Sequence, residues 1–319
     1  MWKSLALSVA LVCLPAAAFA KVPDVVATIQ PLHSLAAMVM DGIGEPHLLV
    51  KGLTSEHGYA LKPSDARALE TAQVVVLVDP NFETFMAKPL QGRTGKIEVM
   101  AMADLPGMNV LKPREGGVWE PHHHDDAHGH EDHGHEDHGS GGHDHDEELD
   151  GHLWLDIGNA RLLLVALSEK LAELDPEHAQ AYRDNAQKAE AHLSELDAKL
   201  KSQLAGLHDR PYVVFHDGYQ YFEARYGLRP AGSITVDPDR PVSAKRLTAL
   251  AEKLRRSKAA CVFREPQFPA PIVQTLADAA NAKIGVLDPQ GASLPTGVTL
   301  YPALLSNLAQ SLTGCLAAP

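Results

Sequence analysis

Short β-rich runs alternate with helical patterns in both halves of this chain, and this alternation constrains the fold more than any other feature. In the first half the β-rich runs are DVVATIQ, PHLLVKG, QVVVLVDP and KIEVM. In the second half they are YVVFHD, AGSITVD, AACVFRE and KIGVLDP. The alternation predicts an α/β fold of two lobes, each built on a mostly parallel sheet. Ligands of such sheets gather at the carboxyl ends of the strands.

A long helical pattern separates the two halves. Asp175 and Pro176 are typical of an N-cap followed by the first helical residue. Apolar residues then recur at spacings of three and four: Ala179, Tyr182, Ala186, Ala189, Leu193, Leu196 and Leu200. The spacing predicts one helix over 176–205, about 45 Å long at about 1.5 Å per residue, as a rigid link between the lobes. The predicted organisation is an N-terminal lobe at 21–158, a helical region at 159–205 and a C-terminal lobe at 206–319.

The N-terminal lobe is interrupted by a segment with no apolar periodicity, from about Pro106 to Gly151. It consists mostly of Gly, His, Asp and Glu, so we expect it to be disordered without a ligand, with the loop itself at about 114–150. Ten histidines lie in it: His122, His123, His124, His128, His130, His133, His135, His138, His143 and His145. Many ligands on a flexible chain predict several weak metal sites rather than one tight site, because each ion must order the loop.

The first twenty residues have the pattern of a secretory signal peptide. Lys3 precedes a short apolar run, and Ala18-Phe19-Ala20 forms a small-x-small cleavage site before Lys21. A membrane anchor is the alternative, although the apolar run is short for a bilayer. We therefore expect a cleaved signal peptide at 1–20 and a periplasmic product.

Two cysteines, Cys261 and Cys315, follow the predicted signal peptide. In an oxidising compartment two cysteines most often form a disulfide, and two buried free thiols are the alternative. The formal net charge is −13, and eleven acidic residues but no Lys or Arg lie between Pro121 and Asp150. This balance argues against nucleic-acid binding, which needs a basic surface, and favours cations as partners.

Three histidines are candidate metal ligands. His57 follows the strand of PHLLVKG, His216 ends YVVF, and His152 lies where the His-rich segment rejoins the folded chain. Each could instead be a hydrogen-bonded or solvated residue, because their spacing is not that of a compact motif. Neutral imidazole is a good zinc ligand, and three imidazoles with an oxygen donor or water make a tetrahedral site. Two carboxylates, Glu56 and Asp288, are available as oxygen donors.

Five motifs, in order from about residue 24 to the C-terminus, resemble one family. EHGYALKPSDARAL, HLWLD, FHDGYQYFE, CVFREPQF and IGVLDPQG are similar to the metal-binding solute-binding proteins of ABC transporters, specifically the zinc-binding, ZnuA-like branch of the cluster A-I family. The resemblance implies two lobes joined by a long helix with the metal in the cleft between them. It also implies a His-rich loop between the first two ligands and a disulfide between Cys261 and Cys315.

The same resemblance implies His57, His152 and His216 as the zinc ligands, and leaves Asp288, Glu56 or water as the fourth. In the manganese branch a carboxylate takes the place of His216, so an imidazole there favours zinc. The implied function is capture of Zn²⁺ by a monomer and its delivery to an inner-membrane ABC permease, with the His-rich loop collecting or sensing zinc. A manganese carrier and a zinc storage protein are alternatives.

A zinc hydrolase is a further alternative, since three histidines and a water could activate a nucleophile. Such an enzyme needs an open coordination position and a general base near the substrate. The sequence contains no separate motif for that base. It also lacks the GxxxxGK[ST] loop of an ATPase, so the energy for transport must come from a partner.

Overall fold

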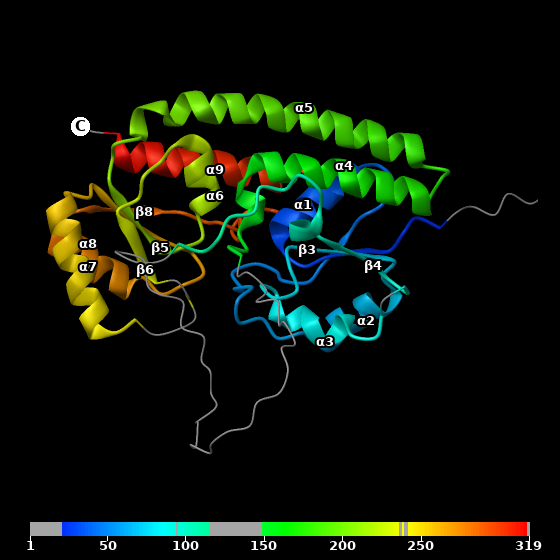
Figure 1. Cartoon of the computed structure of the whole chain (residues 1–319), viewed down its shortest axis with the longest axis horizontal. Helices are drawn as coiled ribbons and strands as arrows, with labels where there is room; N and C mark the ends of the chain where they lie inside the picture. Colours follow the sequence, from blue (N-terminus) through cyan, green and yellow to red (C-terminus); the bar gives the residue numbers. More distant parts are fainter. Residues whose placement is uncertain (1–20, 94, 115–148, 236–237, 239–241, 318–319) are drawn as a thin grey trace, which may run out of the picture.

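The computed structural model describes residues 21–93, 95–114, 149–235, 238 and 242–317 (Figure 1). The predicted signal peptide and the ten histidines of the His-rich segment lie outside these residues. Within them, two lobes lie side by side below a pair of long helices. The described helices include none with the length and apolarity needed to cross a bilayer.

The N-terminal sheet has four parallel strands in the order β2-β1-β3-β4. Its strands are β1 (Val25–Ala27), β2 (His47–Leu48), β3 (Val74–Leu77) and β4 (Glu98–Ala101). Around it lie α1 (Gln30–Val39), α2 (Pro63–Thr71), α3 (Ala87–Leu90) and the 3₁₀ turns η1 (Thr84–Met86) and η2 (Met102–Asp104). Helix α2 begins where predicted: Pro63 fits its first turn, and the Asp65 carboxylate accepts a hydrogen bond from the backbone N–H of Lys62 at 2.8 Å.

The C-terminal sheet repeats this arrangement, with four parallel strands in the order β6-β5-β7-β8. Its strands are β5 (Tyr212–His216), β6 (Gly232–Thr235), β7 (Cys261–Arg264) and β8 (Lys283–Val286). Its helices are α6 (Gln220–Tyr226), α7 (Ala244–Ser257), α8 (Pro271–Ala280) and α9 (Leu300–Leu316). Every predicted strand is present, and the prediction of an α/β fold with parallel sheets is confirmed.

Alternate residues of the strands enter different cores. In β3, Val74 and Val76 face a central core, while Val75 and Leu77 face an outer core beneath α2 and α3. In the C-terminal sheet, Tyr212 and Val214 of β5 face the same central core, and Val213 faces a third core beneath α7 and α8. This follows from the period of two along a strand. Because the inner faces of both sheets share one continuous core, separating the lobes as rigid bodies would expose much apolar surface.

Two long helices join the lobes. These are α4 (Ile157–Leu174), which follows the 3₁₀ turn η3 (Leu153–Leu155), and α5 (Ala179–Leu204), which ends in η4 (Ala205–Leu207). Helix α5 runs over α4 on one side and α9 on the other, and α1 also contacts α9 (Figure 1). The predicted linking helix is thus present, with the predicted buried face that includes Tyr182, Leu193 and Leu200.

The predicted start of α5 is wrong by three residues. Asp175 is the C-cap of α4, and α5 begins at Ala179. The Asp175 carboxylate is fully buried and accepts hydrogen bonds from His178 Nδ1 at 2.7 Å and the Tyr182 hydroxyl at 3.0 Å. Its side chain therefore stabilises the turn between the two helices and does not cap a helix that begins at Pro176.

The predicted disorder from Pro106 is also wrong for the first part of that segment. Asn109 donates to Asp156 and accepts from Asn159 through its backbone carbonyl. The Leu111 N–H donates to the Tyr221 hydroxyl at 3.0 Å, and its carbonyl accepts from Asp150 N–H at 2.9 Å. These polar contacts order residues 106–114 without the apolar periodicity on which the prediction rested.

The predicted disulfide is confirmed. Cys261 and Cys315 are bonded, with their Cα atoms 6.2 Å apart and 54 residues apart in sequence. The bond links β7 to the last turn of α9. Closing a loop of this length stabilises the folded state by about 4 kcal/mol in the chain-entropy model.

Candidate metal centre

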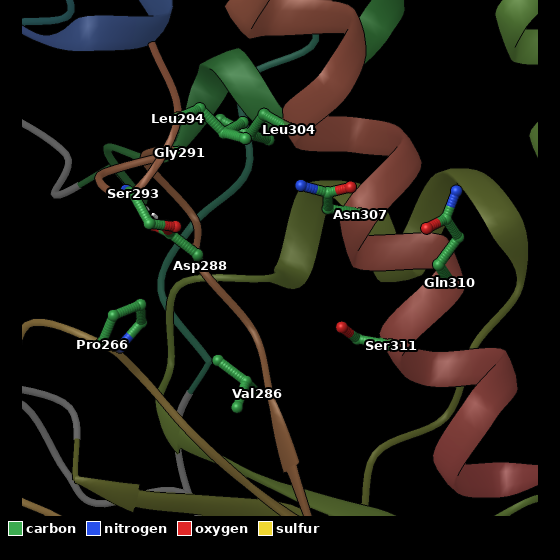
Figure 2. A pocket seen from close by; sticks show the side chains of 10 residues that line it. All are labelled: Pro266, Val286, Asp288, Gly291, Ser293, Leu294, Leu304, Asn307, Gln310 and Ser311. Atoms are coloured by element: carbon green, nitrogen blue, oxygen red, sulfur yellow. Dashed lines mark hydrogen bonds between the residues drawn. The ribbon is translucent and has the colours of Figure 1, made fainter.

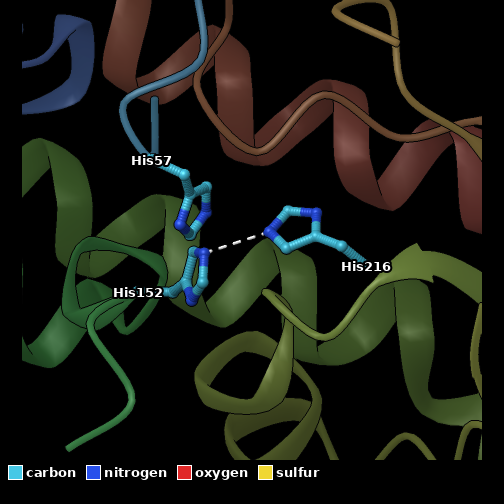
Figure 3. A group of neighbouring side chains, drawn as sticks. All are labelled: His57, His152 and His216. Atoms are coloured by element: carbon cyan, nitrogen blue, oxygen red, sulfur yellow. Dashed lines mark hydrogen bonds between the residues drawn. The ribbon is translucent and has the colours of Figure 1, made fainter. Parts of the chain in front are cut away.

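Three imidazoles from distant parts of the chain meet between the lobes (Figure 3). One ligand atom from each of His57, His152 and His216 lies within 4.8 Å of the other two. The ring centroids are 5.0 Å apart for His152 and His216, 5.7 Å for His57 and His152, and 5.6 Å for His57 and His216. The structure thus brings together the three histidines that the sequence analysis singles out.

His216 stands at the end of β5, a central strand of its sheet. Strands β5 and β7 are neighbours that continue to opposite sides of the sheet, so their carboxyl ends flank the switch point at which ligands bind. Glu265 follows β7 directly, and its Oε1 accepts a hydrogen bond from His216 Nδ1 at 2.5 Å. Both side chains therefore lie at the carboxyl ends of neighbouring strands, where ligands of parallel sheets gather.

His152 lies at the N-cap of η3, immediately before the helices that join the lobes. Asp150, two residues earlier, accepts hydrogen bonds from both the backbone N–H and the Nδ1–H of His152, at 3.1 and 2.8 Å. The Nε2 atoms of His152 and His216 face each other 3.1 Å apart. Two imidazole nitrogens bound to one tetrahedral Zn²⁺ would lie about 3.3 Å apart, given Zn–N bonds of about 2.0–2.1 Å. The pair therefore fits a zinc ion with little movement.

His57 comes from a loop, residues 51–62, between the edge strand β2 and α2. Its side chain is 20% exposed, against 6% for His152 and 2% for His216. The backbone N–H of His57 donates to Ser55 Oγ at 3.2 Å. Further along the loop, the Tyr59 hydroxyl donates to Asp65 at 2.6 Å and so attaches the loop to α2.

Aromatic rings enclose the cluster. The Phe82 ring contacts His57 and His152 edge-on, with centroids 5.3 Å away in each case. Trp154 lies 5.2 Å from His152, and Tyr219 lies 5.9 Å from His216. This wall lowers the local dielectric, which strengthens the attraction of a bound cation for nearby carboxylates.

Glu56, one of the two candidate oxygen donors, lies beside His57. It is 5% exposed, and its Oε1 lies 3.8 Å from His57 Nε2. Burial alone would raise the pKa of Glu56, but the neighbouring imidazoles, His57 first, lower that pKa below its usual value. The carboxylate is therefore ionised and available as an oxygen donor.

Asp288, the other candidate donor, is not brought into the group of three. Its Oδ2 accepts hydrogen bonds from the backbone N–H and hydroxyl of Ser293, at 3.3 and 3.2 Å. It lines a cavity of about 190 Å³ between the end of β8 and α9, together with Asn307 and Gln310 (Figure 2). Neither carboxylate belongs to the group of three: Glu56 lies beside one of its rings, and Asp288 is bonded to Ser293.

The site includes several residues that the sequence analysis missed. Asp150 and Glu265 contact the ligand rings, Phe82 and Trp154 enclose them, and Gly218 approaches them closely. The strand-end rule applies to Glu265 as it does to His216, so that signal was present. A Cβ added to Gly218 would overlap the His216 ring and lie 2.9 Å from His152 Nε2, and nothing in the local sequence indicates this.

The carboxylates around His216 change the pKa of its imidazole. Burial disfavours its imidazolium form, but the facing Glu265 carboxylate, with smaller contributions from Glu56 and Asp217, raises the pKa of His216 to about 9. Asp217 itself is held by the Arg114 guanidinium, which also donates to Glu223 at 2.7 Å. The positive charge of Arg114 thus compensates the negative charges of Asp217 and Glu223, which lie near His216.

Two parallel α/β lobes around a buried cluster of three imidazoles define a metal-binding solute receptor. Comparison with known proteins specifies which kind. Residues 25–315 match the family described as the periplasmic component A of the zinc-uptake complex, ZnuA, and the chain belongs to this family. The family consists of solute-binding proteins of ABC transporters, not of enzymes, and the chain is accordingly a zinc-binding periplasmic solute-binding protein.

Individual relatives agree with this assignment. The high-affinity zinc uptake system protein ZnuA of Brucella abortus (strain 2308) is 44% identical over 304 residues, covering 92% of this chain and 91% of the relative. A crystal structure of ZnuA with residues 138–173 deleted and zinc bound superposes with a TM-score of 0.74 at 23% identity. It covers 94% of this chain and 100% of the solved chain. The structure of the periplasmic zinc-binding protein TroA from Treponema pallidum superposes with a TM-score of 0.75 at 20% identity. It covers 93% of this chain and 99% of TroA.

Proposed function

We propose that this chain captures Zn²⁺ in the periplasm on His57, His152 and His216 and delivers it to an ABC-type zinc permease. The observation that carries the proposal is the convergence of three imidazole nitrogens within 4.8 Å in a member of a zinc-uptake family. Three neutral imidazoles with one oxygen donor match the donor set and geometry that zinc takes in proteins.

Glu56 supplies the fourth donor in this proposal. Its carboxylate is buried, ionised and 3.8 Å from His57 Nε2, so a small movement of the loop places an oxygen on the ion. One carboxylate among three imidazoles also halves the charge of the bound Zn²⁺ in a buried site. Water and Asp288 are the alternatives for this position.

The nitrogen-rich donor set selects zinc over manganese. Mn²⁺ favours oxygen donors and higher coordination numbers, whereas imidazole binds zinc well. The buried His216 at the strand end is central to this choice, because a carboxylate there would give the site a second oxygen donor.

The His-rich segment serves as an auxiliary zinc collector or sensor in this proposal. The described chain leaves at Arg114 and returns at Leu149, and both ends lie beside the cluster. Leu111 and Asp150 are joined by a backbone hydrogen bond, and the Tyr221 hydroxyl donates to the Asp150 carbonyl at 2.8 Å. Attachment of the His-rich segment at these two ends supports a role in raising the zinc concentration near the three-histidine site.

Deletion of residues 121–148 tests this division of roles. We expect the mature protein without them to keep one tightly bound Zn²⁺ and to lose only weaker ions, as measured by chelator competition and metal analysis. The triple variant His57→Ala, His152→Ala, His216→Ala should show the opposite result. If the deletion removes the tightest ion, the two roles are reversed. If both variants keep several ions of equal affinity, the protein is a zinc store.

Delivery is tested in cells that lack this protein but retain the cognate permease. Wild-type protein should restore growth on zinc-depleted medium, and the triple variant should not. Competition between Zn²⁺ and Mn²⁺ for the purified protein tests the manganese alternative: tighter binding of Mn²⁺ would indicate a manganese carrier instead.

A further inference from the structure

In two of the three histidines, the ring nitrogen that faces away from the other imidazoles is hydrogen-bonded to a buried carboxylate. Glu265 Oε1 lies 2.5 Å from His216 Nδ1, and Asp150 Oδ1 lies 2.8 Å from His152 Nδ1. The Glu265 and Asp150 side chains are 1% and 6% exposed, so water does not compete for these hydrogen bonds. A carboxylate at Nδ1 keeps a proton on Nδ1, so Nε2 is the nitrogen that binds the ion.

Two tyrosines of the segment that follows His216 contact these two acidic residues. The Tyr219 hydroxyl donates to Glu265 Oε1 at 3.0 Å. The Tyr221 hydroxyl donates to the backbone carbonyl of Asp150 at 2.8 Å. Both tyrosines are at most 2% exposed. Tyr219 therefore holds the Glu265 carboxylate directly. The Asp150 carboxylate is held by the backbone N–H of His152, and Tyr221 anchors the Asp150 backbone.

We propose that Glu265 and Asp150 are positioning residues of the zinc site, each holding one histidine in the tautomer and orientation that presents Nε2 to the ion. The two Nε2 atoms, 3.1 Å apart, then form a prearranged two-nitrogen platform before the ion arrives. This inference rests on the proposed function, because it assumes that the histidines bind zinc.

The burial of Glu265 supports a positioning role over a purely structural one. Its second oxygen, Oε2, is buried and has no hydrogen-bond partner among the described residues. A buried polar atom without a partner costs stability. This cost is not expected for a side chain that serves only stability. It is expected for a carboxylate whose role is to orient His216.

The test combines removal of each carboxylate with a conservative replacement. Glu265→Ala and Asp150→Ala should each weaken zinc binding by about 10–100-fold, the usual effect of removing such a partner. Glu265→Gln, whose carbonyl still accepts from Nδ1–H, should stay within about tenfold of wild type. Asp197→Ala is the control: Asp197 is a buried carboxylate bound to Arg225 and Tyr226, and its loss should lower stability without changing zinc affinity.

A second measurement reads the tautomer directly. In ¹⁵N-labelled zinc-bound protein, NMR should show His216 protonated at Nδ1 and ligated through Nε2. This signature should broaden or change in Glu265→Ala, return in Glu265→Gln and be intact in Asp197→Ala. Should Glu265→Ala not fold, Tyr219→Phe replaces it, with Tyr226→Phe as its matched control; the first should alter the His216 signal and the second should not.

The outcomes separate this inference from the proposed function. Wild-type protein that binds no zinc tightly contradicts the proposed function itself. Wild-type protein that binds zinc tightly, together with a folded Glu265→Ala variant of unchanged affinity and unchanged His216 signal, overturns the positioning role. The same holds for an unchanged signal in Tyr219→Phe.

Discussion

The two halves of the metal centre are built differently. His152 and His216 are buried and held by carboxylates, and His216 ends a strand in the middle of a sheet. His57 lies on a loop after an edge strand and is the most exposed of the three. Leu53 in the same loop is 57% exposed. We infer that the site combines a fixed pair, His152 and His216, with a third ligand, His57, on a loop that can move.

The shared core explains why movement belongs to the loop. Both sheets pack their inner faces into one continuous apolar cluster with α1, α4, α5 and α9. Opening the lobes would expose this surface at roughly 25 cal/mol per Å². Moving the exposed part of the loop around Leu53 breaks fewer contacts, such as the hydrogen bonds from His57 N–H to Ser55 and from Gly52 N–H to Gln30, each worth about 1 kcal/mol. Capture and release are therefore expected to use the loop.

Removing the ligands one at a time should give the largest effect. If about 12 kcal/mol of zinc-binding free energy is shared by three imidazoles, losing His216 costs about 4 kcal/mol, near 1000-fold in affinity. We expect His216→Ala and His152→Ala to reach this value. His57→Ala should cost about 100-fold, since the fixed pair and Glu56 are left. Chelator competition measures all three; equal losses would remove the distinction between the two halves.

Filling the space beside the fixed pair should have the next largest effect. In Gly218→Ala the new methyl group overlaps the His216 ring and approaches His152 Nε2, so both rings must shift. Overpacking of about 1–3 kcal/mol corresponds to a loss of about 10–100-fold in zinc affinity. Gly206→Ala is the matched control, because a Cβ there meets nothing within 4 Å. Similar affinities for the two variants would mean that the pair is not rigid.

Proton competition at the fixed pair should give a smaller effect. The pKa of His216 is raised to about 9, so below that pH the ion-free protein holds a proton that zinc must displace. Affinity should therefore rise by about tenfold per pH unit between pH 7 and 9, with protons released on binding. The raised pKa also stabilises the ion-free fold, fully below the usual value of 6.5, and this contribution is lost as pH rises through about 9.

Isothermal titration in buffers of different ionisation enthalpy counts the released protons. The ion-free protein should also lose thermal stability from pH 6.5 to 9, while the zinc-bound protein should not. An affinity independent of pH over that range would show that His216 is neutral in the ion-free protein.

Loosening the loop should have the smallest effect. Ser55→Ala removes the acceptor of the His57 N–H bond, worth about 1 kcal/mol, so the affinity should fall by about fivefold. Most of the loss should appear as faster zinc release, measured by stopped-flow transfer to a chelator. The exposed Thr54→Ala serves as control. Unchanged release from Ser55→Ala would place the moving part elsewhere.

The sequence alone determined the order of elements, and it predicted three metal ligands. The strands and helices follow from apolar periodicity and from end signals such as Pro63 and Ser243, which depend on neighbours within one or two turns. The strand-end rule singles out His216 and His57, the return of the chain from the His-rich segment singles out His152, and the resemblance implies all three as ligands. These features could be predicted because each is set locally or by a rule common to parallel sheets.

Only the tertiary structure decided which side chains meet. Glu265 is 49 residues from His216, and only the folded chain shows that Glu56 lies beside His57 while Asp288 is bonded to Ser293. The ordered course of residues 106–114 likewise depends on Tyr221, more than 100 residues later. Local patterns carry no information on such pairs, because a hydrogen bond between distant segments forms only after packing has fixed both backbones.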